Sequence, residues 1–99
     1  PMPPEASRLD STAITSLLID RSRILWVGTD GNGIYRFRIV NVHPAQFLDT
    51  IQPDLFSRKG LKSATINQIY EGSDPAEDVV WIGTYDAGVH LFSRSKNSF

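Results

Sequence analysis

A short pattern built around one tryptophan occurs twice in this chain of 99 residues. The first copy, residues 24–37, reads Ile-Leu-Trp-Val-Gly-Thr-Asp-Gly-Asn-Gly-Ile-Tyr-Arg-Phe, and the second, residues 80–92, reads Val-Trp-Ile-Gly-Thr-Tyr-Asp-Ala-Gly-Val-His-Leu-Phe. In both copies a short apolar run is followed by a turn rich in Gly, Asp and Asn and then by a second short run, which predicts a β-hairpin. A hairpin that returns after about 55 residues is an internal repeat, and a repeat constrains the architecture of the whole chain.

Similar strands surround each hairpin. The first unit is predicted to hold strands at 14–19, 24–29 and 33–38 and a fourth, outer strand at 46–51. The second unit is predicted to hold strands at 65–71, 79–84 and 88–93, and its own outer strand would start near Phe99. Residues 39–42 could prolong the third strand, and Asp54–Phe56 are compatible with a short helical turn. We therefore divide the chain into an extended lead-in at 1–12, one unit at 13–62 and a second at 63–99.

The strand at 24–29 carries apolar side chains on both of its faces. Alternation places Leu25, Val27 and Thr29 on one face and Trp26 with Gly28 on the other. A glycine inside a strand often marks the close approach of a bulky group, for which a tryptophan of a neighbouring sheet is one candidate. A sheet with two apolar faces needs a neighbour on each side.

Four-stranded antiparallel sheets that stack around an axis form a β-propeller. The predicted fold is therefore all-β, with about two four-stranded antiparallel blades of a β-propeller. These blades are either a fragment of a longer propeller or part of a ring completed by oligomerisation, because closure takes about four to eight blades. A small sandwich of two sheets is the remaining alternative.

Composition excludes several classes of function. The chain has no cysteine, so disulfides and thiolate chemistry are excluded, and its net charge of −1 gives no basic field for nucleic acid. No apolar run approaches the roughly 20 residues that span a bilayer, so we expect no membrane contact within this chain. The first residues lack the basic start and apolar core of a signal peptide, and the chain reads as an excerpt.

No pattern for a metal, a cofactor or catalysis stands out. The turn after Thr29 contains Asp30, but an EF-hand would need an acidic residue at Gly28 and a glutamate at Ile39, so a hairpin turn is the better interpretation. His43 and His90 have no second ligand at metal-binding spacing and are expected at the surface or in strand packing. No Gly-x-Ser-x-Gly motif or Ser-His-Asp set is found. We predict no cofactor, no metal site and no catalytic residue.

The repeat resembles that of the two-component regulator propeller family. The matching residues are Ile14, Leu17, the run from Leu25 to Asp30, Gly33, Ile34 and Phe37, together with Gly60-Leu61 ahead of the strand at 66–71. The resemblance covers residues 13–38 and 60–94. The chain departs from the family in the longer, more basic connection at 39–59 and in the absence of a further blade after the second unit.

The resemblance implies a sensor region of a bacterial hybrid histidine kinase. Such a region lies on the periplasmic or extracellular side of the inner membrane and typically binds carbohydrate breakdown products, so it is not an enzyme itself. The implied partners are an oligosaccharide or another small polar ligand and further propeller blades, in cis or in trans. The repeat residues implied to be structural are Trp26, Gly28, Thr29, Gly33, Trp81, Gly83, Thr84 and Gly88.

In propellers, the turns between the second and third strands and the connections between blades lie on one rim of the central channel. The ligand-binding candidates on this rim are Asp30, Asn32, Tyr85, Asp86 and Lys62, with Ser63 beside them. Their carboxylate, amide, ammonium and aromatic groups suit a polar ligand. Ordinary solvated turns are the alternative for the polar residues, whereas Trp26 and Trp81 are expected to pack between blades.

Two other functions stay open at this point. One is a lectin-like module that assembles from several copies into a ring, and the other is a fragment of a lyase or hydrolase propeller with an active site on the channel rim.

Overall fold

The structure is a computed structural model that describes residues 12–39 and 45–99. Seven strands and no helix form in this part of the chain. The strands are β1 (Ile14–Ile19), β2 (Ile24–Thr29), β3 (Ile34–Arg38), β4 (Gln46–Ile51), β5 (Ile66–Glu71), β6 (Val79–Thr84) and β7 (Val89–Ser93). Each predicted strand is present, with ends that differ by at most about one residue, as expected where strand boundaries are set by turns.

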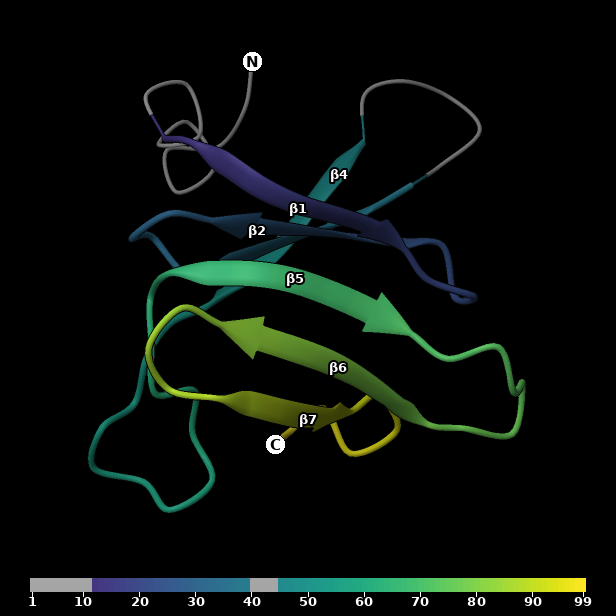
Figure 1. Ribbon diagram of the computed structural model, residues 1–99. Helices are drawn as coiled ribbons and strands as arrows, with labels where there is room; N and C mark the ends of the chain where they lie inside the picture. The colour runs from purple at the N-terminus through teal and green to yellow at the C-terminus, as the bar shows by residue number, and fades with distance from the viewer. Residues whose placement is uncertain (1–11, 40–44) are drawn as a thin grey trace.

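The strands form two antiparallel sheets, with orders β1-β2-β3-β4 and β5-β6-β7. Figure 1 shows the sheets stacked one over the other, with β5 lying alongside the first sheet. The prediction of an all-β chain with two antiparallel blade-like sheets is confirmed. In the described residues the second sheet has three strands, and Ser98 returns only as far as a bridge to Ser93.

The two sheets also share an irregularity. In the first, the pairing of β1 with β2 shifts between Ile14 and Ser16, and in the second the pairing of β5 with β6 shifts between Ile66 and Gln68. Beyond this shared irregularity, β5 is the edge strand of the second sheet, and the amide of Ile69 donates to the hydroxyl of Ser16 in the first sheet, at 2.9 Å. This hydrogen bond joins one sheet to the next.

The main core lies between the sheets. Trp26 is 1% exposed and packs edge-on against Phe92 with ring centroids 5.3 Å apart. The eight buried members of this core are Trp26, Ile34, Leu61, Ile66, Ile69, Val80, Ile82 and Phe92. Leu25 and Val27 belong to a separate cluster with Tyr35, Phe37 and Phe47. The predicted division of β2 into two apolar faces is confirmed.

Gly28 lies under an isoleucine. A Cβ added to Gly28 would stand 2.8 Å from Cγ2 of Ile66 and 3.3 Å from Cδ1 of Ile69. The prediction that something bulky approaches this backbone is correct, but the proposed tryptophan is wrong. Trp81 lies on the far face of the second sheet, because its neighbours Val80 and Ile82 are the residues that face the first sheet.

The sequence predicts two features between β3 and β5, a prolonged third strand at 39–42 and a helical turn at Asp54–Phe56. Asp54–Phe56 do not form a helical turn, because the Asp54 carboxylate accepts hydrogen bonds from the amides of Phe56 and Ser57, both at 3.1 Å, and this competes with helix formation. Ile39 lies outside β3, and the predicted continuation at 40–42 lies outside the described residues, as do the lead-in at 1–11 and His43.

Candidate ligand-binding sites

The two hairpin turns have the same hydrogen-bond framework. The Thr29 hydroxyl donates to the carbonyl of Gly33 at 2.7 Å and accepts from the amide of Asn32 at 3.0 Å. The Thr84 hydroxyl donates to the carbonyl of Gly88 at 2.7 Å, and it accepts from the amide of Ala87 at 2.9 Å. The threonine of each Gly-Thr pair therefore fixes its turn, which is a structural role rather than a ligand-binding one.

A backbone conformation that favours glycine closes both turns. Gly33 and Gly88 each have φ near +75°, and side chains with a Cβ adopt that region at a cost. Because the hydroxyl of the threonine and the φ of the glycine are the same in both units, the side chains between them project from rigid and equivalent positions. The pattern Thr-x-x-x-Gly is therefore associated with the same turn geometry in both units.

Both turns meet at one end of the molecule, which we call the turn end: residues 30–33, 63–65 and 85–88. Asp30 forms a bridge with Thr65, and the amide of Tyr85 donates to the carbonyl of the same Thr65 at 3.1 Å. The amides of Gly31 and Gly33 donate to the carbonyl of Ala64. Figure 1 shows the two turns on the left, at the start of β5. The structure thus brings Asp30, Tyr85 and Asp86 to one end.

The remaining two candidates make contacts within the fold. The Asn32 side chain donates to the Thr12 hydroxyl at 2.5 Å, and the Asn32 carbonyl accepts from Gln52 at 3.0 Å. The ammonium of Lys62 donates to the carbonyls of Asp54 and Ser57, so it closes the loop between the sheets. Spacing along the sequence does not determine which way the long side chain of Lys62 turns.

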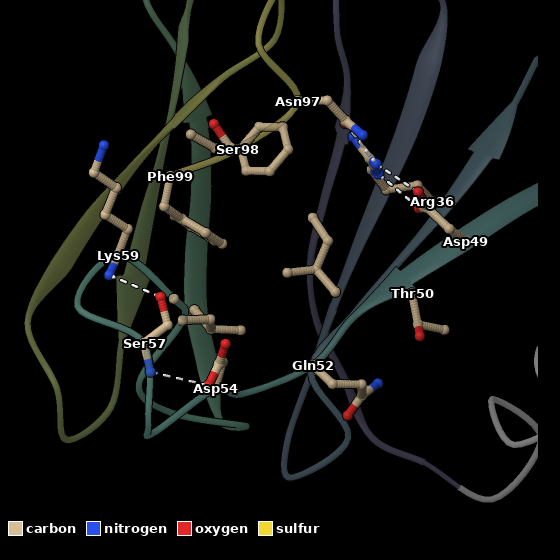
Figure 2. Close-up of a pocket in the computed structure, with 14 residues that line it drawn as sticks. Arg36, Asp49, Thr50, Gln52, Asp54, Ser57, Lys59, Asn97, Ser98 and Phe99 are labelled. Atoms are coloured by element: carbon tan, nitrogen blue, oxygen red, sulfur yellow. Dashed lines mark hydrogen bonds and ion pairs between the residues drawn. The ribbon is translucent and has the colours of Figure 1, made fainter.

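A cleft of about 510 Å³ opens between β4, the connection at 52–61 and residues 97–99, as Figure 2 shows. It exists because the second sheet, in its described part, is one strand narrower than the first, so part of β4 is not covered. The guanidinium of Arg36 lies in this cleft and holds the Asp49 carboxylate through two hydrogen bonds of 2.7 and 2.6 Å. The charge of Arg36 is thus paired with Asp49 within the chain.

The cleft was not found from the sequence. The guanidinium carbon of Arg36 stands 5.1 Å from the Trp26 ring and 5.2 Å from the Phe92 ring, so the cation lies on the aromatic core. Arg36 is the cross-strand partner of both Trp26 and Asp49. Pairing the predicted strands in register would have shown this cluster, because directly opposed side chains on one face lie in contact.

A second hollow lies on the outer face of the second sheet. It has a volume of about 610 Å³ and is lined by Tyr70, Trp81, Gly83 and Val89 together with polar residues of the 72–77 turn. The Trp81 ring is 41% exposed, and its Nε1 donates to a carboxylate oxygen of Glu77 at 3.2 Å. The prediction that both tryptophans pack between sheets therefore holds for Trp26 but not for Trp81 within this chain.

His90 packs between the sheets beside Phe99, with ring centroids 5.8 Å apart. Its Nδ1 is buried and has no hydrogen-bond partner in the described part of the chain. Burial, and to a smaller extent the charge of Lys62, lower the pKa of His90 from its usual 6.5. The expected strand-packing role of this histidine agrees with its position.

This lowered pKa predicts how stability depends on pH. A base whose folded pKa is depressed binds fewer protons when folded, so the free energy of unfolding falls as the pH drops below about 6.5. Replacement of His90 by Phe, which keeps a ring against Phe99, should make this fall shallower. Urea unfolding of both proteins at several pH values between about 7 and 5 measures the two slopes. Equal slopes would show that His90 does not contribute.

The described residues contain no group of three or more His, Cys, Asp or Glu side chains that could hold a metal ion. No helix in the described residues is long and apolar enough to cross a membrane.

Comparison with known proteins gives one family. The model of the family described as two component regulator propeller matches residues 8–31, which include β1, β2 and the first two residues of the first turn. Searches among curated proteins and among solved structures gave no match. The resemblance seen in the sequence is thus confirmed by a family model at the first hairpin. Residues 8–31 thus match the model of the two component regulator propeller family, and the second tryptophan-bearing hairpin of the chain repeats the sequence pattern of the first.

Proposed function

We propose that this chain is a non-catalytic, ligand-sensing propeller module of a bacterial two-component signalling protein, and that a carbohydrate-like ligand binds at the turn end. The observation that supports this proposal most is that Asp30, Tyr85 and Asp86 lie at one end of the molecule, on two turns with the same threonine and glycine hydrogen-bond framework. Tyr85 is 76% exposed, so its side chain is accessible to a ligand.

The chemistry of this end suits a sugar. An exposed aromatic face packs against the C–H face of a pyranose, and carboxylates accept hydrogen bonds from its hydroxyl groups. Rigid turns reduce the ordering cost of binding, because the side chains are already in place. The module would lie on the periplasmic or extracellular side and pass its signal to a histidine kinase. A coding sequence that joins this chain to a membrane-spanning segment and a kinase supports the signalling role, and one without either contradicts it.

Loss of Tyr85 is expected to weaken binding. Calorimetric titration of the chain with neutral gluco-, xylo- and manno-oligosaccharides should identify a ligand, and Tyr85→Ala should raise its Kd about tenfold, the effect of about 1.4 kcal/mol of lost stacking. Asp86→Asn should also weaken binding, since the amide replaces an acceptor-only group.

Phe56→Ala is the matched control. The Phe56 side chain is fully exposed in the connection between the sheets, so its loss should leave the Kd unchanged. A ligand that binds the parent and the Tyr85 and Asp86 variants equally would exclude the turn end as its site. If none of these sugars binds, the ligand class is wrong.

A further inference from the structure

The connection between the two sheets includes a loop that projects from the fold, residues 53–62, which we call the connecting loop. Figure 1 shows it as the teal coil at the lower left, beyond the edges of both sheets. Two large apolar side chains stand at its tip: Phe56 is fully exposed and Leu55 is 70% exposed. Adjacent large apolar side chains left in water at one tip are typical of an interaction site.

Hydrogen bonds within the connecting loop hold this tip in place. The amide of Asp54 donates to the carbonyl of Leu61 at 2.7 Å, which closes the base of the loop. The ammonium of Lys62 donates to the carbonyls of Asp54 and Ser57, and the Asp54 carboxylate accepts from the amide of Phe56. Because the loop is already ordered, its tip can bind a surface without a large further cost in conformational entropy.

Positive charge is concentrated beside the apolar tip. Arg58 and Lys59 are exposed, and neither forms an ion pair within residues 12–39 and 45–99. With Lys62, the connecting loop carries three cations and one carboxylate, although the whole chain has a net charge of −1. Apolar side chains flanked by cations match a surface of anionic lipid, since the apolar groups enter the headgroup boundary and the cations approach the phosphates.

The tip lies apart from the cleft beside β4. Leu55, Phe56 and Arg58 do not line this cleft, whereas Asp54 and Lys59 do. A ligand or a further strand that filled the cleft would therefore cover the inner side of the connecting loop and leave its tip in water. The exposure of the tip thus does not depend on what occupies the cleft.

We propose that the connecting loop docks the protein on an anionic phospholipid bilayer, with Leu55 and Phe56 in the headgroup region and Arg58 and Lys59 against lipid phosphates. A projecting tip can enter a bilayer directly, whereas a protein partner would have to supply a pocket that fits it. Docking of this kind needs no membrane-spanning run. The proposal replaces the sequence-based expectation of no membrane contact, which considered only such a run.

The test is co-sedimentation of the whole chain with vesicles of phosphatidylglycerol and phosphatidylcholine in equal parts, in about 0.1 M salt, where surface charges still act over about 10 Å. Vesicles of phosphatidylcholine alone should bind about tenfold more weakly, because they lack the charge that attracts the cations. On the mixed vesicles, Phe56→Ser should weaken binding about tenfold through the loss of apolar contact. Arg58→Gln should weaken it about fivefold, the usual effect of one cation near an anionic surface.

Two exposed residues outside the connecting loop supply matched controls. Leu17→Ser removes a 64% exposed apolar side chain from β1, and Arg38→Gln removes an exposed cation from β3, so both variants should bind the mixed vesicles like the parent. Far-UV circular dichroism and thermal melting check that all four variants are folded, as expected for changes of exposed side chains.

Three results would overturn the proposal. A parent that does not bind the mixed vesicles would leave the tip as a contact for a protein partner instead. Equal binding by the parent and by either variant of the connecting loop would place the lipid contact elsewhere on the molecule. Losses in the two controls as large as those in the loop variants would show that binding depends on general charge and apolar surface rather than on this tip.

Discussion

Replacement of Trp26 by alanine should lower the free energy of unfolding by about 3–5 kcal/mol, the range for a large aromatic residue removed from a packed core. Replacement of Trp81, its counterpart in the second unit, should cost about 1 kcal/mol or less, since its ring is half-exposed. Loss of a tryptophan at the same strand position thus has very different effects on stability in the two units. Trp26 is buried between the two sheets, whereas Trp81 lies on the outer face of the second sheet.

The contacts of Trp26 explain the size of the effect. Its ring packs edge-on against Phe92 and carries the guanidinium of Arg36 at 5.1 Å, and its Nε1 donates to Oδ2 of Asp20 at 2.9 Å. Alanine would leave a cavity between the sheets and an Asp20 oxygen without its donor. Both losses destabilise the fold, since a cavity forfeits packing and a buried acceptor without a partner is costly.

Urea unfolding followed by circular dichroism gives the two free energies. Similar losses for Trp26→Ala and Trp81→Ala would contradict the structure, because they would require the two rings to be equally buried in a single copy.

The strands of this fold follow from local sequence. Alternation of apolar residues and the Asp, Asn and Gly residues of the turns are local signals, so the ends of β1, β2 and β4 were predicted as they are found. The second sheet was then predicted by analogy with the first. The prediction of the strands and the prediction of the second sheet depend only on residues that are close in the chain or equivalent in the two units.

Features that depend on contact between the sheets were not predicted. The neighbour of Gly28 is Ile66 rather than a tryptophan, because the choice between them depends on which face of the second sheet turns inward. The Arg36–Asp49 pair needed the register of β3 with β4, and this register contains a bulge. Lys62 closes a loop because its flexible side chain reaches the carbonyl of Asp54, a contact that spacing along the chain does not determine.

The turn end was partly predictable for the same reason. The repeat placed Asp30 and Tyr85 in equivalent turns, and stacking of like sheets brings equivalent turns to the same end. The way in which Thr65 joins both turns through its backbone could not be read from residue types, since main-chain donors and acceptors are the same at every position except proline.

Gly28→Ala should destabilise the chain by about 1–3 kcal/mol, the usual cost of extra atoms in a packed core. Gly83→Ala, the matched control, should be neutral or stabilising by up to about 1 kcal/mol, since alanine lowers the entropy of the unfolded chain where the native backbone accepts it. The opposite signs have a geometric cause. An added Cβ meets Cγ2 of Ile66 at 2.8 Å above Gly28, whereas above Gly83 the nearest atom stands at 3.8 Å.

Ile66 cannot yield easily to a new methyl group at position 28. It is branched at Cβ, fully buried and enclosed by Ile69 and the rest of the core between the sheets, so relief requires the two sheets to move apart. Ile66→Ala in the Gly28→Ala background should therefore cost less than the sum of the two single changes, because the second change removes the clash made by the first. A double-mutant cycle by urea unfolding measures this coupling. Additive losses, or equal effects of alanine at positions 28 and 83, would mean that the two sheets do not stack through Gly28 and Ile66.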